Sequence, residues 1–283
     1  MRKLVANLIS KTRRSGDPAF PGSPSKGTAL AVIGDVHGYS DLFRQIIARI
    51  EQRSSELSPD RLVIVQVGDM IDRGPDSAGC LDIAVEQSAR RDIEFVPLLG
   101  NHEVFLRLCL RSDEDCLDHV ADWLMFGGRQ TVDSLLGGAS CPPLPDVLND
   151  PVTFRRNLQD ALEGARMELL ENMRSHYRDG SVLISHAGFP EDDPVDEVLA
   201  LSWDDVSPGH WAWTREPSEI SLSFQGQECG IVHGHSIHDE ARPVGARFPV
   251  DTGIYRSGRL SAALFFEDSY EVLEVSGNQG AIS

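Results

Sequence analysis

Polar side chains that can bind metal ions recur at five places in the sequence, each time after a run of apolar residues and beside a glycine. The first is the segment Gly34-Asp-Val-His-Gly38, which follows the apolar residues 30–33. Glycine at such positions lets the backbone turn sharply and lets a ligand come close. Core packing does not account for carboxylates and imidazoles at five strand ends, so the clusters predict a metal site. Its candidate residues are Asp35, His37, Asp69, Asn101, His102, His186 and His235.

These side chains suit a centre of two divalent ions about 3.5–4 Å apart. Mixed oxygen and imidazole ligands fit Mn, Fe or Zn better than Mg or Ca. A water molecule between two such cations loses a proton near neutral pH and can attack phosphorus in line. We expect Asp69 to bridge the ions. The remaining ligands would be Asp35 and His37 for one ion, and Asn101, His186 and His235 for the other.

Four further roles follow from the same clusters. Arg73 and Arg215 could hold the oxygens of a phosphoryl group by bidentate hydrogen bonds, with Asn101 as a further substrate contact. His102 lies next to Asn101 and is placed to protonate the leaving oxygen. Asp72 could fix the tautomer of His102.

The elements that must position these residues alternate between strand and helix patterns. We expect strands at 30–33, 61–67 and 94–99, with helices at about 41–57 and 76–90 between them. This alternation is typical of βαβ units in a layered α/β fold. Polar clusters at the carboxyl ends of such strands meet at one edge of the sheet, where ligands bind in open α/β sheets.

The remainder of the chain continues as one domain, 28–283, without a second boundary. Residues from about 104 to 180 read as a helical insertion beside the site, and we expect Trp123 and Phe126 to pack inside it. The segment 123–134 is expected to cover the cleft rather than to carry chemistry. Strands are expected at 181–184 and 230–232, and closing antiparallel strands at 248–252, 260–266 and 270–275.

Residues 1–27 differ in composition from the rest. They carry six basic residues against one acid and end in a stretch rich in Gly, Pro and Ser. We expect a flexible basic tail; weak docking to an anionic membrane or partner is the alternative.

Composition narrows the possible partners. The net charge of −18 argues against nucleic acid, because the phosphate backbone would be repelled. Bound divalent cations can reverse that sign locally, so a phosphorylated substrate remains possible. No apolar run reaches the roughly 18 residues of a membrane span, so no stable membrane insertion is expected. The five scattered cysteines favour a reducing cytoplasm over a disulfide framework.

The three motifs Gly-Asp-Val-His-Gly, Gly-Asp-Met-Ile-Asp-Arg-Gly and Gly-Asn-His-Glu, in this order, resemble the calcineurin-like metallophosphoesterases. The Asp-Arg-Gly ending and the complete Gly-Asn-His-Glu point to the branch of PPP-type serine/threonine protein phosphatases and symmetrical diadenosine tetraphosphate hydrolases. The resemblance runs from about residue 30 to 275. It implies a sandwich of two mixed sheets flanked by helices and a dinuclear, often manganese-dependent, phosphatase.

The family's functional residues match positions of this sequence. Its metal ligands match Asp35, His37, Asp69, Asn101, His186 and His235, and its phosphate arginines match Arg73 and Arg215. Its acid histidine and partner aspartate match His102 and Asp72. Many other metallophosphoesterases have Gly-His-x-His at the last turn, but here the second histidine position is Ile237. The PPP-type site, with His235 as the sole ligand of this turn, is therefore expected.

The substrate stays open at this point. The leading interpretation is a bacterial-type serine/threonine phosphoprotein phosphatase that uses a metal-activated water. The same chemistry would serve a dinucleoside polyphosphate hydrolase or a small-molecule phosphatase. A non-catalytic phospho-binding scaffold would predict a lost ligand or acid, and none is missing. The oligomeric state is not indicated.

Overall fold

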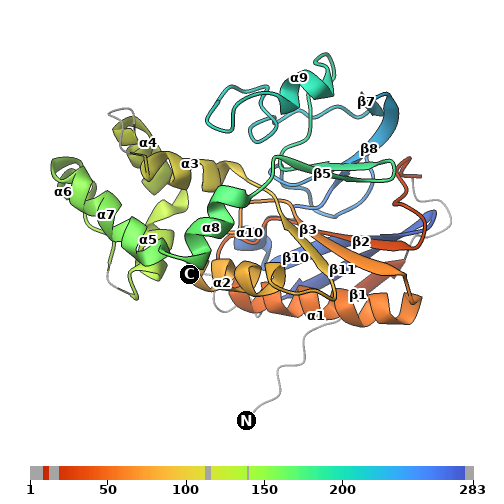
Figure 1. The fold of residues 1–283 in the computed structure, drawn as a ribbon, viewed down its shortest axis with the longest axis horizontal. Helices are drawn as coiled ribbons and strands as arrows, with labels where there is room; N and C mark the ends of the chain where they lie inside the picture. The colour runs from red at the N-terminus through yellow and green to blue at the C-terminus, as the bar shows by residue number, and fades with distance from the viewer. Residues whose placement is uncertain (1–8, 13–18, 112–115, 139, 278–283) are drawn as a thin grey trace, which may run out of the picture.

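Two mixed β-sheets packed face to face bring the strand ends together (Figure 1). We describe a computed structural model of the chain, covering residues 9–12, 19–111, 116–138 and 140–277. The larger sheet has the strand order β1-β11-β10-β2-β3-β4. Its strands β2, β3 and β4 are parallel, whereas β10, β11 and β1 are antiparallel to their neighbours. The bounds are β1 (Ile9–Thr12), β2 (Thr28–Ile33), β3 (Arg61–Gln66), β4 (Glu94–Pro97), β10 (Arg259–Phe266) and β11 (Ser269–Ser276).

The second sheet has five strands, in the order β5-β6-β8-β7 with β9 also paired to β8. The bounds are β5 (His176–Asp179), β6 (Val182–Ser185), β7 (Leu222–Phe224), β8 (Gln227–His233) and β9 (Arg247–Pro249). The strand expected at 248–252 corresponds to β9, but its predicted antiparallel direction is wrong, because it runs parallel to β8. The loop after β8 returns the chain so that Arg247, at the start of β9, pairs with Ile231 of β8.

Strand β2 is buried on both faces, which explains its uninterrupted apolar sequence. Leu30 and Val32 belong to the core between the two sheets, together with Ile184 and Val232 of the second sheet. Ala31 and Ile33 point the other way, into the core that the helices cover. Alternate side chains of β2 therefore point into different cores, one between the two sheets and one beneath the helices.

Helices α1 (Ser40–Leu57) and α2 (Ser77–Ser88) lie along the outer face of the larger sheet (Figure 1). Both were expected from the spacing of apolar residues. Ile46 and Ile50 of α1 are fully buried. The carboxylate of Asp76 caps α2 by accepting a hydrogen bond from the backbone N–H of Gly79 at 2.9 Å.

The predicted helical insertion forms a group of helices beside the sheets (Figure 1). It consists of α3 (Asn101–Cys109), α4 (Cys116–Trp123), the π-helical turn η1 (Leu124–Gly128), α5 (Arg129–Leu135), α6 (Leu144–Asn149), α7 (Pro151–Leu162) and α8 (Ala165–Asn172). Trp123 is fully buried, as expected. The prediction for Phe126 is wrong: its side chain is 54% exposed. The π-helical turn, with Gly127 at φ 117°, directs this residue away from the packed face.

The segment predicted as a tail is partly attached to the domain. Strand β1 pairs with β11 through its backbone. Phe20 packs against Phe248 and Phe265, with ring centroids 5.6 and 5.3 Å apart. The backbone N–H of Ser23 donates to the hydroxyl of Ser181 at 2.9 Å. The boundary predicted at residue 27 therefore falls too late, because Phe20 supplies a ring that the two-sheet core uses. Residues 1–8 and 13–18 lie outside the described part.

Within the described ranges, none of the helices has the length and apolar character needed to cross a lipid bilayer. Cys80, Cys141 and Cys229 are free thiols. Two short helices complete the described chain, α9 (Val195–Leu199) and α10 (Ile254–Ser257).

Candidate metal centre

The strand-end residues meet at one edge of the sandwich, as expected from parallel strands. In the described part of the chain, two groups of three side chains have ligand atoms within 4.8 Å of one another. The first group is His37, Asp69 and His102, and the second is Asp69, His186 and His235. Asp69 belongs to both groups, which supports the bridging role proposed for it. The first group contains His102, which was predicted as the acid rather than as a ligand.

The backbone at these positions is strained. Eight non-glycine residues of the described chain have positive φ, and five of them are candidate site residues. They are His37, Asp69, Asp72, Arg73 and His235. Such conformations persist only where the surroundings enforce them, and they concentrate at functional sites. Glycines allow the close approach: a Cβ at Gly100 would collide with the carboxylate of Asp69.

Backbone carbonyls orient two of the imidazoles. His37 Nδ1 lies 3.0 Å from the carbonyl oxygen of Ile71, and His186 Nδ1 lies 2.9 Å from that of Val67. A ring whose Nδ1–H donates to a carbonyl keeps its Nε2 lone pair for a metal. Burial lowers the pKa of both rings. Burial likewise lowers the pKa of His235 to about 3, with His186 adding to the effect.

The amide oxygen of Asn101 lies between two of these rings. It is 3.0 Å from His186 Nε2 and 2.9 Å from His235 Nδ1. His235 Nε2 is buried and has no hydrogen-bond partner among the described residues. A buried polar atom without a partner is costly. The Asn101 amide oxygen and the imidazoles of His186 and His235 converge here, which fits a bound cation.

Asp35 lies slightly apart from the two groups. Its carboxylate accepts a hydrogen bond from the backbone N–H of His235 at 3.1 Å. Burial, Asp251 and Asp69 raise its pKa well above the ordinary value. Burial also raises the pKa of Asp251 to about 6. Asp251 was not singled out in the sequence, although Asp251-Thr-Gly253 follows the apolar residues 248–250 in a pattern similar to the other clusters. Two neighbouring buried carboxylates repel each other unless they bind a cation or share a proton.

Asp69 is ionised despite its burial. Burial alone would raise its pKa, but His186, His102 and His37 outweigh that effect and lower it. Its backbone N–H donates to the carboxylate of Glu103 at 2.8 Å. The same carboxylate accepts from the backbone N–H groups of Met70 and Gly100 at 2.7 and 3.1 Å. Glu103 thus ties the turn after β3 to the start of α3. It lies in the Gly-Asn-His-Glu motif, but its role became evident only in three dimensions.

The predicted pair of His102 and Asp72 is present. His102 Nδ1 lies 2.6 Å from Asp72 Oδ2. Two residues of the insertion donate to the same carboxylate, Trp123 through Nε1 at 2.9 Å and Thr131 through its hydroxyl at 2.5 Å. Burial opposes the charged form of His102, but Asp69 and Asp72 outweigh it and raise its pKa. A protonated His102 is the form that a general acid requires.

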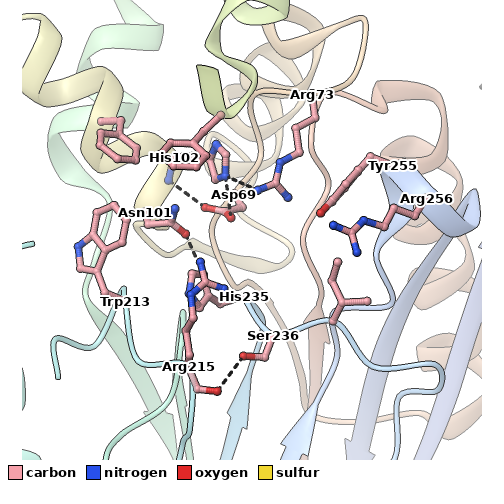
Figure 2. A pocket seen from close by; sticks show the side chains of 13 residues that line it. Asp69, Arg73, Asn101, His102, Trp213, Arg215, His235, Ser236, Tyr255 and Arg256 are labelled. Carbon is pink, nitrogen blue, oxygen red and sulfur yellow. Dashed lines mark hydrogen bonds and ion pairs between the residues drawn. The ribbon is translucent and has the colours of Figure 1, made fainter. Parts of the chain in front are cut away.

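Arg73 faces two imidazoles. Its Nη1 lies 2.8 Å from His37 Nε2. Its Nη2 lies 2.9 Å from His102 Nε2 (Figure 2). The backbone N–H of Arg73 donates to the carbonyl oxygen of Gly127 at 3.1 Å, so the insertion also positions this residue. Arg215 is exposed and borders the same cavity.

That cavity has a volume of about 380 Å³ and opens above Asp69. Asn101, His102 and His235 also border it. The remaining lining residues are Phe105, Phe126, Trp213, Ser236, Ile237, Tyr255 and Arg256. None of these seven was predicted as a site residue, because they come from separate segments, although Ser236 and Ile237 directly follow His235.

Comparison with known proteins places the chain. A family model described as calcineurin-like phosphoesterase matches residues 28–245. Serine/threonine-protein phosphatase 1 of Salmonella typhimurium is 36% identical over 97 residues, covering 34% of this chain and 38% of that protein. The symmetrical bis(5'-nucleosyl)-tetraphosphatase of Acidovorax sp. is 29% identical over 176 residues, covering 62% and 49%. Serine/threonine-protein phosphatase 2 of Escherichia coli is 22% identical over 245 residues, covering 81% and 89%. The chain thus matches less than half the length of the first two relatives.

Solved structures support the same fold. A cold-active protein tyrosine phosphatase has a TM-score of 0.52 at 18% identity, covering 88% of this chain and 81% of that one. A serine/threonine phosphatase from Saccharomyces cerevisiae has a TM-score of 0.51 at 12% identity, covering 91% and 85%. The family match extends from β2 to the loop before β9 and includes every motif of the candidate centre. The chain belongs to the calcineurin-like phosphoesterases.

Proposed function

We propose that the chain hydrolyses phosphoric esters by direct attack of water on phosphorus, with two divalent metal ions, most suitably Mn²⁺, as cofactors. The observation that carries this proposal is the placement of three groups around one cavity: two ligand clusters sharing Asp69, the His102–Asp72 pair, and Arg73. When bound, the two ions supply Lewis-acid activation of the attacking water and of the phosphoryl oxygens. The residues proposed to hold them are Asp35, His37, Asp69, Asn101, His186 and His235.

The protein's own groups would bind the phosphoryl group and move the proton. Arg73 and Arg215 would bind its non-bridging oxygens, with the Asn101 amide as a further contact. Asp72 accepts from His102 Nδ1, so His102 Nε2 points to the cavity. A proton on Nε2 would pass to the leaving oxygen as its bond to phosphorus breaks.

Phosphoserine and phosphothreonine side chains are the first substrate candidates. Their leaving groups are alkoxides, which need a proton donor, and the raised pKa of His102 supports that role. Two of the relatives above are named serine/threonine-protein phosphatases.

A dinucleoside polyphosphate is the second candidate. Another relative is named a bis(5'-nucleosyl)-tetraphosphatase. Aromatic side chains border one side of the cavity and Arg256 adds a further positive charge, which are features that a base and a phosphate chain could use.

Parallel assays in the presence of Mn²⁺ test the proposal. The substrates are a phosphoserine peptide, a phosphotyrosine peptide and diadenosine tetraphosphate. Release of phosphate from the first, abolished by a chelator and restored by Mn²⁺, would support the phosphoprotein reading. Faster cleavage of the dinucleotide would favour the second candidate. The absence of any hydrolysis with Mn²⁺, Fe²⁺ or Zn²⁺ would refute the proposed activity.

A further inference from the structure

One arginine in the cavity is not among the residues proposed to hold the metal ions, bind the scissile phosphoryl group or move the proton. Arg256 lies on the short helix α10 and borders the cavity (Figure 2). Its guanidinium lies 5.2 Å from the centroid of the Tyr255 ring. Among the residues that the structure describes, no carboxylate forms an ion pair with Arg256. In a chain of net charge −18, an arginine that faces a cavity without a carboxylate partner indicates an anionic ligand.

Tyr255 connects Arg256 to the arginine proposed to bind phosphate. The guanidinium carbon of Arg73 lies 4.3 Å from the centroid of the same ring. Both cations therefore interact with one aromatic ring. Figure 2 shows the Tyr255 hydroxyl and the Arg256 guanidinium on the same side of the cavity, directed into it. Two cations on a shared ring suit two neighbouring anionic groups rather than one.

The opposite side of the cavity is aromatic. Phe105 stacks on Phe126 with ring centroids 5.9 Å apart, and it contacts Trp213 edge to face at 5.1 Å. Trp213 lies across the cavity from Arg256 in Figure 2. The exposed ring of Phe126 offers a face for a flat organic group.

We propose that Arg256 and the Tyr255 hydroxyl form a second anion subsite. It binds the phosphoryl group that is linked to the scissile one. The subsite rests on the proposed function, because the scissile group must occupy the site beside Arg73. This second subsite favours the second candidate above over the first, because a phosphoserine side chain carries only one phosphoryl group. The substrate class would be a nucleoside di- or polyphosphate, with the base against Phe105 and Phe126. An acidic phosphopeptide is less suited, because it would extend beyond the cavity onto a negatively charged protein.

Inhibition by two small anions tests the subsite. Inorganic phosphate carries one phosphoryl group, and methylenediphosphonate carries two that cannot be separated by hydrolysis. Each competes with p-nitrophenyl phosphate in excess Mn²⁺, and the ratio of the two inhibition constants is measured for each variant. We expect the wild type to prefer the diphosphonate and Arg256→Gln to reduce that preference by about tenfold, since charge-assisted hydrogen bonds are lost. Arg91→Gln removes the same charge from an exposed site outside the cavity and should keep the wild-type ratio.

Three further outcomes have defined meanings. An unchanged ratio in Arg256→Gln would overturn the subsite. A loss confined to a phosphoserine peptide with a neighbouring aspartate would also overturn it and assign Arg256 to acidic peptides. If the wild type hydrolyses no ester, the proposed function fails on its own. Calorimetric binding of methylenediphosphonate to the manganese-loaded wild type and Arg256→Gln proteins then decides the subsite: equal affinities overturn it, and a tenfold loss supports it.

Discussion

At the scale of single residues, Asp69 combines three properties that are rarely found together. It adopts a positive φ of 54°, its carboxylate is buried, and it is surrounded by imidazoles from four different strand ends. Burial of a carboxylate is unfavourable unless cations or hydrogen bonds compensate it. Glu103, which itself accepts the backbone N–H of Asp69, brings a further negative charge close by. Buried negative charge of this kind is unfavourable in a metal-free protein, and bound divalent cations would compensate it.

Asp69→Asn should lower the rate of ester hydrolysis by roughly three orders of magnitude, because a neutral amide bridges two cations poorly. The rate on p-nitrophenyl phosphate and the bound metal per chain are to be measured together, with circular dichroism to confirm the fold. The exposed Asp41→Asn is the matched control and should retain full activity. Near-normal activity of Asp69→Asn would contradict the bridging role.

His102→Asn should separate good leaving groups from poor ones. Nitrophenolate leaves without a proton, whereas the alkoxide of serine needs one, and a general acid contributes about 10²–10⁴-fold. We therefore expect a much larger loss with a phosphoserine peptide than with p-nitrophenyl phosphate. Equal losses on both substrates would show that His102 does not act as the acid and would favour its presence in the first ligand cluster as a metal contact.

At the scale of elements, the helical insertion reaches into the centre instead of only covering it. The sequence suggested that residues 123–134 cover the cleft, yet Trp123 and Thr131 both donate to the carboxylate of Asp72. The backbone of Gly127 accepts from Arg73. The carboxylate of Asp72 is therefore positioned by residues more than fifty positions further along the chain.

Thr131→Val should weaken the action of His102 while leaving the metal ligands in place. Without the hydroxyl, Asp72 is free to turn and orients the imidazole less well, which costs about tenfold to a hundredfold for such supporting contacts. The loss should be greater for a phosphoserine peptide than for p-nitrophenyl phosphate. Thr131→Ser keeps the hydroxyl and should restore most of the rate. A purely structural defect would instead lower both rates equally and would not be rescued by serine.

Sequence patterns predicted well those parts of the fold that have local causes. Apolar runs and flanking glycines place Asp35, Asp69 and His186 at strand ends, because the period of two and the sharp turns are properties of short segments. The orientation of Phe126 and the direction of β9 depend on a π-helical turn and on a returning loop, which have no comparable local signal. Arg256 lies on α10, outside the sequence motifs, and only the tertiary structure shows that it borders the cavity.

At the scale of the whole molecule, Phe20 packs against the core between the two sheets. Phe20→Ala should lower the free energy of unfolding by about 2 kcal/mol, because a partly buried ring leaves a cavity between Phe248 and Phe265. Denaturant unfolding measures this value. The activity at 25 °C should stay unchanged, since Phe20 lies outside the cavity. Ala19→Ser, at the exposed neighbour, is the control and should change stability little. A decrease in the free energy of unfolding of less than about 0.5 kcal/mol would contradict the packing role of Phe20 and favour a detached tail.

Metal removal should destabilise the entire domain, because the ligands come from both sheets. Asp35 and Asp69 follow strands of the larger sheet, and His186 and His235 follow strands of the second. A divalent cation bound between the two sheets favours the native state by about 2.7 kcal/mol at a free concentration of 100 times its Kd. For a chain of this size, that corresponds to a rise in Tm of several degrees. Chelation followed by a thermal scan should lower Tm, and added Mn²⁺ should restore it together with activity. Asp69→Asn should show a much smaller response to Mn²⁺; an equal response in both proteins would place the stabilising ion elsewhere than between the two sheets.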